Sequence, residues 1–384
     1  MELKNGLSQR LTVADAIYYL SISVYFIVTS LSYTMLSYMI NGQLIYYIKI
    51  LIMVLILFKI FVLDGIPIPK LIIILLGLVL MVYSYHVAKA LDILELYVLV
   101  VGAHNVDLKK VIGSYLTINI VVLILGIVLV KKNVIMDLTY TRDGVMRHSL
   151  GKVYPTILAS NLFYMVSGFV YILKDLKVKW VKMAEVIIIV LVSYISYTFT
   201  KTRTDLVCSL LLIVAVYIEP DLKIMKAKIT KLLLAATPLI IFAISIYVMI
   251  NYSSFSRFWN NMNEFSNGRL YFSNFAYQNF PPNFFGQYIE QNGNGGLNNL
   301  VLIGEKYFYI DSSYIRILLM NGIVAFISFY LVIQNFFMRA IKKNKYVSII
   351  LMILALIEGF FSSSFLIIGF NPLLLMLLNL SKEE

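Results

Sequence analysis

The sequence predicts an all-α protein that crosses a membrane many times. Of its 384 residues, 60% are hydrophobic and 14% are charged, and the mean hydropathy is +0.86. A soluble domain carries about 25% charged residues, so the composition excludes an ordinary soluble globule. The apolar runs are long and uniform, as membrane helices require, and lack the alternation of barrel strands. We therefore expect a single integral membrane domain over 1–384.

Hydropathy places about twelve helical spans along the chain, each of roughly 20 apolar residues. The fourth, eleventh and twelfth are short, so we expect half-spans or helices packed inside the bundle. The expected limits are 13–38, 44–63, 71–87, 92–105, 112–130, 154–173, 183–199, 205–219, 232–250, 312–336, 347–360 and 366–380.

Lysine-rich loops set the expected orientation. The segments 174–182, 223–231 and 339–345 all fall on the side of the N-terminus. Short cytoplasmic loops carry an excess of Lys and Arg, so both termini are expected in the cytoplasm. The loops 131–153 and 251–309 are then outside. This topology accounts for most of the net charge of +12, which therefore does not indicate a nucleic-acid partner.

Arginine is distributed against this pattern. Arg10 and Arg339 are expected in the cytoplasm, whereas six arginines are expected on the outer side: Arg142, Arg147, Arg203, Arg257, Arg269 and Arg316. A guanidinium can bind a phosphate or carboxylate through two parallel hydrogen bonds. The outer arginines therefore suggest an anionic ligand outside. Attraction to anionic lipid headgroups at the span ends is the alternative.

The first outer loop, 131–153, is rich in charge just before a predicted span. Arg142, Asp143, Arg147 and His148 lie close together in it. Asp143 can pair with either arginine, and His148 can be an acid–base group or an ordinary surface residue. We expect this loop to contribute to a site on the outer face.

A short turn, FTKTRTDLV at 199–207, separates the seventh and eighth spans. A charge so close to the hydrocarbon is costly and usually faces a cavity, which favours a functional role for Arg203. A solvated turn is the alternative interpretation. Thr204 or Asp205 can cap the helix that follows, and its N-terminus would add to the positive field.

The large outer loop, 251–309, predicts two helices. Aromatic residues and Met262 recur at helical spacing over 255–265, which is typical of an amphipathic helix on the membrane surface. Ser266 or Asn267 could cap a second helix that begins at Gly268. Arg269 would then lie in its first turn, beside free backbone N–H groups that favour an anion.

Several common motifs are absent. The chain has no Walker A loop, HExxH, GxSxG, CxxC or carboxylate cluster with metal-ligand spacing. We therefore expect a reaction with no metal and no cofactor.

Taken together, the outer motifs resemble the Wzy-type polysaccharide polymerases of bacterial O-antigen and capsule pathways, relatives of the O-antigen ligases. Four stretches carry the likeness: RHSLGKVYP (147–155), TKTRTDLV (200–207), SNGRLYF (266–272) and YIDSSYIRILLMNGIVAF (309–326). The closing GFFSSSFLIIGFNPLLLMLL (359–378) is similar to the terminal segment of the family.

The resemblance implies a glycosyltransferase of the C type (GT-C) with its active site outside the bacterial plasma membrane. The expected substrates are undecaprenyl-pyrophosphate-linked glycans, which would be polymerised into O-antigen, capsular polysaccharide or exopolysaccharide without a metal. Membrane lipids, a flippase and a chain-length regulator are the candidate partners. An O-antigen ligase of the same fold, or a flippase for lipid-linked oligosaccharides, is the alternative function.

The resemblance also implies roles for individual residues. Arg203 and Arg269 match paired outer-loop arginines that the family uses around the pyrophosphate, and Arg147 and Arg316 are expected to join them. Asp311 falls near the position of a functional histidine in the ligase branch, which makes it the candidate general base. His148 matches a further family pattern and is the second catalytic candidate. Glu305 and Asp143 are further candidates for the base.

Overall fold

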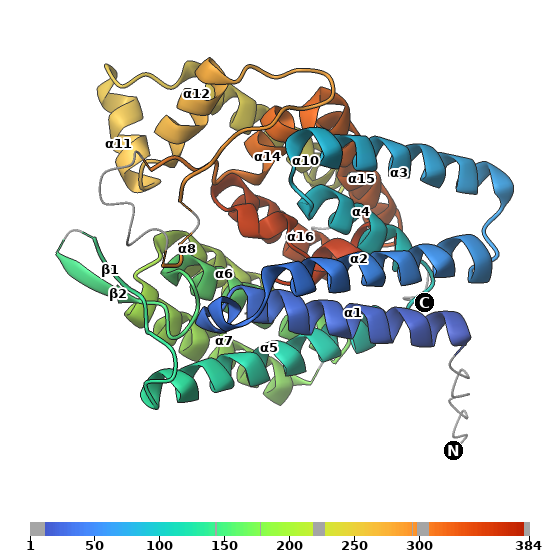
Figure 1. Cartoon of the computed structure of the whole chain (residues 1–384), viewed down its shortest axis with the longest axis horizontal. Helices are drawn as coiled ribbons and strands as arrows, with labels where there is room; N and C mark the ends of the chain where they lie inside the picture. Colours follow the sequence, from blue (N-terminus) through green and yellow to red (C-terminus); the bar gives the residue numbers. More distant parts are fainter. Residues whose placement is uncertain are drawn as a thin grey trace.

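A computed structural model describes residues 12–142, 144–176, 178–217, 227–293, 295–297 and 307–379. It confirms a mostly helical, polytopic membrane protein (Figure 1). Eight helices in this part of the chain are long and apolar enough to cross a membrane: α1 (Val13–Ser32), α2 with the π-helical turn η2 (Gly42–Leu63), α3 (Ile68–Ala88), α5 (Leu108–Lys131), α6 (Pro155–Leu173), α7 (Lys179–Thr200), α10 (Lys228–Asn251) and the continuous α14–η3–α15 (Ser313–Lys342).

The other predicted spans are shorter. They correspond to α4 (Asp92–Gly102), α8 (Arg203–Tyr217) and α16 (Tyr346–Phe361). In place of a twelfth helix, two 3-10 segments follow, η4 (Ser363–Leu366) and η5 (Pro372–Leu377), and all six residues of η5 are buried. Pro372 cannot donate a backbone hydrogen bond, so it separates the two segments. The count of about twelve spans therefore stays a prediction.

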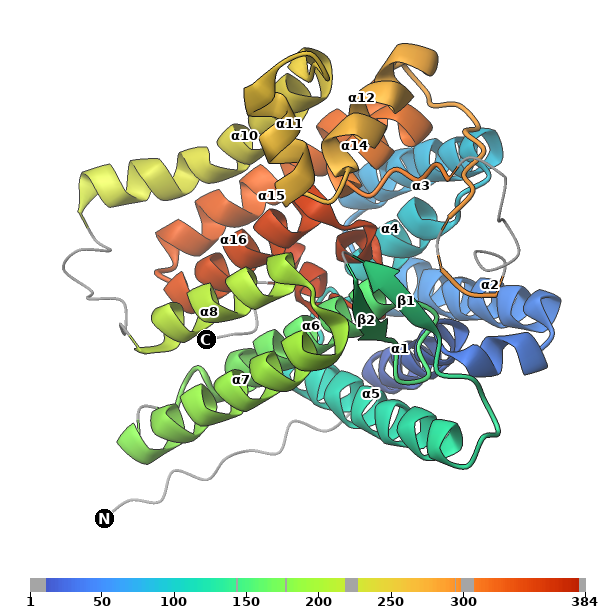
Figure 2. The ribbon, with the colours of Figure 1, turned by 90° about the vertical axis from the view of Figure 1, so that its left-hand side faces the viewer.

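Both predicted outer loops lie at the same end of the bundle, on the left in Figure 1 and facing the viewer in Figure 2. The first contains an antiparallel hairpin of β1 (Thr139–Arg142) and β2 (Val145–His148). The second contains α11 (Arg257–Phe265), which has no buried residue, and α12 (Arg269–Asn279). Phe255, just before α11, is 99% exposed. These features fit the expected surface helix followed by a second helix.

The cap of α12 differs from the prediction. Its N-cap is Gly268, with a φ of 84°, rather than Ser266 or Asn267. The Ser266 hydroxyl instead donates to the carbonyl of Asn263, so it closes α11. A left-handed residue is needed for the sharp turn between the two helices, and glycine adopts this conformation without strain.

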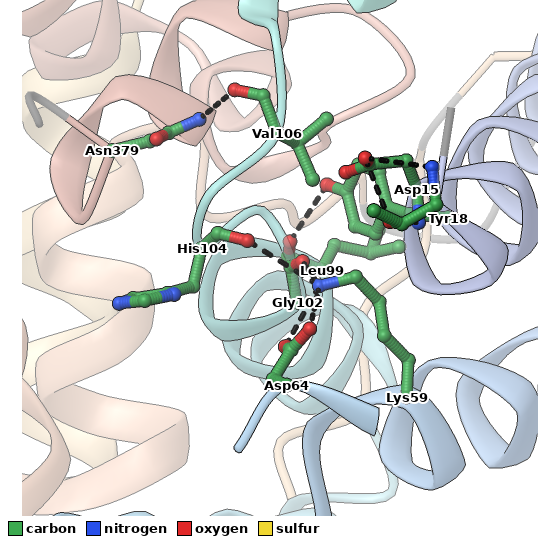
Figure 3. A network of polar contacts seen from close by, with 10 residues as sticks. Asp15, Tyr18, Lys59, Asp64, Leu99, Gly102, His104, Val106 and Asn379 are labelled. Carbon is green, nitrogen blue, oxygen red and sulfur yellow. Dashed lines mark hydrogen bonds and ion pairs between the residues drawn. The ribbon is translucent and has the colours of Figure 1, made fainter. Parts of the chain in front are cut away.

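At the opposite end, a buried ion pair joins α1, η2 and α4 (Figure 3). Lys59 Nζ donates to both carboxylate oxygens of Asp64, at 2.9 and 2.7 Å, and to the carbonyl of Gly102 at 2.9 Å. It also lies 5.6 Å from the centre of the Tyr18 ring. The two charged side chains are 1% and 5% exposed. Both charges are removed from water, so the loss of either one would leave the other buried without its partner.

Replacing Asp64 by alanine should therefore destabilise the protein strongly. It leaves the Lys59 charge buried without its carboxylate, a change that typically costs about 3–5 kcal/mol. The double variant Lys59→Met with Asp64→Leu should recover most of this loss, because neither charge remains. The measurement is the thermal unfolding midpoint in detergent.

The exposed pair of Lys109 and Asp175, 2.6 Å apart, is the control, and Asp175→Ala should cost about 1 kcal/mol or less. An equal effect of the two alanine variants would contradict the prediction.

Candidate functional site

A small pocket, of about 40 Å³, lies where the elements of the loop-bearing end meet. Its lining brings together segments far apart in the sequence: the start of α12, residues 307–311, the start of α6, and the segment 362–367, which includes η4. Its polar side chains are Arg269, Asp311, Thr156, the serines 362–364 and four tyrosines, Tyr33, Tyr154, Tyr307 and Tyr309. We name it the Arg269 pocket. One cation, one carboxylate and many hydroxyls suit an anionic, hydroxyl-rich ligand.

Arg269 and Asp311 face each other in this pocket. Arg269 Nε lies 3.8 Å from Asp311 Oδ2, and the two side chains are 13% and 22% exposed. Arg269 is the first residue of α12, as predicted, so free backbone N–H groups lie beside its side chain. Asn263 Oδ1 accepts from the Tyr271 N–H at 3.0 Å and so fixes this first turn. A phosphate in the pocket could therefore bind a guanidinium and a helix N-terminus together.

Burial and the neighbouring arginines have opposite effects on the pKa of Asp311. Burial raises its pKa above the usual value of 3.8, and the nearby Arg269, then Arg316 and Arg142, lower it. A carboxylate of raised pKa is more basic than an exposed one. Asp311 is therefore suited to accept a proton from a hydroxyl group.

Hydroxyl groups make up the opposite wall. Tyr309 OH and Ser363 Oγ are 3.0 Å apart, and Ser313 Oγ donates to the carbonyl of Ser362 at 2.6 Å. Burial raises the pKa of Tyr307 and Tyr309, so both phenols keep their protons and can donate hydrogen bonds. This wall could position sugar hydroxyls beside Asp311.

Glycine allows the chain at 295–296 to pack against the residues just before α6, beside the pocket. Gly295 has a φ of 80°, and a Cβ there would lie 2.6 Å from the carbonyl oxygen of Val153. The neighbouring Gly296 N–H donates to the same carbonyl at 2.8 Å. A larger residue at 295 would push the loop away from the start of α6, so the glycine is required by close packing.

Arg147 is buried beneath the short turn rather than open to the pocket. It is 2% exposed, its Nε donates to the carbonyl of Thr200 at 2.6 Å, and its Nη2 donates to Thr202 Oγ1 at 3.4 Å. Burial, followed by the neighbouring Arg142, lowers the pKa of Arg147 to about 10, so it stays charged at neutral pH. Arg147 therefore connects β2 to the short turn through hydrogen bonds, whereas the sequence analysis expected it to bind the pyrophosphate.

Arg203 lies at the exposed start of α8, outside the lining of the Arg269 pocket. Because α8 begins at Arg203, Thr204 and Asp205 lie within its first turn and neither is the cap. Asp205 is 5% exposed, and its Oδ1 atom has no hydrogen-bond partner among the described residues. The charges of Arg269 and Arg147 act on Asp205, but neither Asp205 nor Arg203 lines the Arg269 pocket.

His148 is also outside the pocket. Its Nδ1 lies 2.7 Å from Asp137 Oδ2. The other carboxylate oxygen of Asp137 accepts from the N–H groups of Ser149 and Leu150, at 3.1 and 2.7 Å. These bonds fasten the end of the hairpin. The remaining base candidates, Asp143 and Glu305, lie outside the described residues.

Of the predicted site residues, the structure thus brings Arg269 and Asp311 together. Arg316 lines a neighbouring pocket. Sequence reasoning missed the serines 362–364 as site residues. Three successive hydroxyls in an otherwise apolar terminal segment were the available signal for the serines.

The described residues contain no group of three or more His, Cys, Asp or Glu side chains placed to hold a metal ion. The Arg269 pocket offers one carboxylate, one guanidinium and several hydroxyl groups. The chain matches no family model, no curated protein and no solved structure.

Proposed function

We propose that the protein is a polysaccharide polymerase. It would join undecaprenyl-pyrophosphate-linked oligosaccharide units on the outer face of the bacterial plasma membrane. The observation that carries this proposal is the Arg269–Asp311 pair, 3.8 Å apart, in a hydroxyl-lined pocket at the loop-bearing end of a membrane bundle. The resemblance of the outer motifs to Wzy-type polymerases supports the same assignment.

The pair suits each half of the glycosyl transfer. Asp311 accepts the proton of an acceptor hydroxyl, and the oxygen of that hydroxyl bonds to the anomeric carbon of the donor sugar. The bond from that carbon to the pyrophosphate breaks, and the leaving group gains negative charge. Arg269 and the N-terminus of α12 stabilise this charge. Both groups are held before the reaction begins, so little reorganisation is needed.

A flippase is less well supported. It would be expected to place charged groups along one path through the spans. In the described spans, Lys49 Nζ lies 2.9 Å from Glu95 Oε1. Glu358 accepts from Ser160 at 2.9 Å and from Tyr164 at 2.5 Å. The two sets lie on different helices, α2 with α4 and α16 with α6, so these charged groups do not follow one path through the spans.

The test is the length profile of surface polysaccharide after deletion of the gene. A polymerase predicts single repeat units that still reach the surface but no polymer, and the wild-type gene should restore the polymer. Loss of single repeats as well would favour a flippase. Full-length polymer that is not attached to its surface acceptor would favour a ligase. An unchanged profile would exclude all three functions.

A further inference from the structure

A second pocket, of about 340 Å³, adjoins the Arg269 pocket. It is lined by the chain between α3 and α4, by Tyr288 and Ile289, and by Arg316. We name it the Arg316 pocket. Four residues line both pockets, namely Tyr33, Tyr309, Ser363 and Ile367. The two pockets are therefore neighbours with one shared wall, to which Tyr309 and Ser363 contribute a hydroxyl pair.

The Arg316 pocket repeats the charge arrangement of the first. Arg316 Nη2 lies 3.8 Å from Asp92 Oδ2, the first residue of α4, and the side chains are 14% and 35% exposed. Arg316 Nη1 donates to Gln291 Oε1 at 3.0 Å, which fixes the guanidinium. The Asp92 contact is too long for a hydrogen bond, so N–H donors of Arg316 remain available to a ligand.

A second cation lies in the same pocket. Lys89 is exposed and follows the end of α3 with a left-handed φ of 55°. With Arg316 and Lys89 against Asp92, the charged side chains that line the pocket sum to +1. A planar guanidinium held by an amide, together with a mobile ammonium, is suited to a phosphate group.

We propose that the Arg316 pocket binds the phosphate head of a second lipid-linked substrate, the acceptor, while the Arg269 pocket binds that of the donor. The identity of the head group rests on the proposed function. Polymerisation joins two substrates of one class, so two similar pockets are needed. Asp311 lines the Arg269 pocket and not the Arg316 pocket. A base is needed beside the anomeric carbon of the donor, where the acceptor hydroxyl attacks and loses its proton, whereas the acceptor pyrophosphate keeps its bond.

The shared wall explains how the two substrates could meet. The acceptor glycan would extend from the Arg316 pocket past Tyr309 and Ser363, and its terminal hydroxyl would reach Asp311. Each residue of the shared wall lines both pockets. A single layer of residues therefore separates the two proposed substrates.

The test is the number of short polyprenyl pyrophosphates that the full-length protein binds in detergent. Native mass spectrometry with farnesyl pyrophosphate should show two bound molecules on the wild type. Arg316→Ala and Arg269→Ala should each show one, and the double variant should show none. Farnesol, which has no phosphate, should not reproduce this pattern. One bound molecule on the wild type, or two on Arg316→Ala, would overturn the proposal.

Lys89→Asn is the second variant, because Lys89 is exposed and asparagine tolerates a left-handed φ. It should weaken one binding event by about tenfold and leave the other unchanged, and an unchanged pair of affinities would count against the proposal. The result is independent of the deletion experiment. Two bound molecules with normal polymer after deletion would refute the proposed function alone, whereas one bound molecule with loss of polymer would refute the second site alone.

Discussion

Asp311→Asn should reduce polymer synthesis by about 100-fold or more, the usual effect of losing a general base. Asparagine keeps the size of the side chain but cannot accept the proton of a sugar hydroxyl. It also keeps polar contact with Arg269, so the protein should accumulate normally in the membrane. The measurement is the rate of polymer formation by purified protein from lipid-linked repeat units. Asp175→Asn, at an exposed position of the opposite end, is the control and should retain normal activity.

The pH dependence provides a second readout of the same residue. The base works when it is deprotonated, so the rate should be low below the pKa of Asp311 and level above it. Burial raises this pKa, and Arg269 lowers it more than any other neighbour. Arg269→Ala should therefore move the acidic limb of the rate profile to higher pH. Near-normal polymer from Asp311→Asn, or an acidic limb that does not move, would assign the base to another group.

The positions of the helices followed from local patterns. The third span was expected at 71–87 and α3 covers Ile68–Ala88, because a run of apolar side chains is enough to define a membrane helix. Arg269 was expected in the first turn of its helix, because Ser266 and Asn267 just before it are residues that favour a helix N-terminus. These predictions needed no knowledge of tertiary contacts.

The wall of the site could not be predicted in the same way. Ser362 and Ser363 meet Ser313 and Tyr309 across about 50 residues of sequence, and no periodicity reports such a contact. Arg203 and Asp205 show a second limit. Residues two apart on a helix point to different sides, and sequence alone does not reveal which side is buried. Arg203 was expected at the ligand, whereas the structure leaves it exposed and buries Asp205.

Arg269→Lys should be nearly as damaging as Arg269→Ala, with a loss of polymer synthesis of about 10²–10³-fold, typical of removing one donor to a developing anion. Lysine keeps the positive charge beside Asp311, but a single ammonium cannot form two parallel bonds to a phosphate. Because the charge is kept, the pH profile of Arg269→Lys should stay close to that of the wild type. The lysine variant thus distinguishes the hydrogen-bond geometry of residue 269, which sets the rate, from its charge, which sets the pH profile.

Arg203→Lys is the matched comparison for the pyrophosphate clamp. If Arg203 and Arg269 grip one pyrophosphate, as the family resemblance implies, the two lysine variants should be equally impaired. The exposed position of Arg203, outside the Arg269 pocket, instead leads us to expect at least half of the normal polymer from Arg203→Lys and from Lys201→Ala. The assay is polymer formation at equal amounts of protein in the membrane. Full activity of Arg269→Lys would show that a positive charge alone is sufficient at this position. The reaction would then need no bidentate contact between the guanidinium and a phosphate, because a single ammonium would replace it without loss.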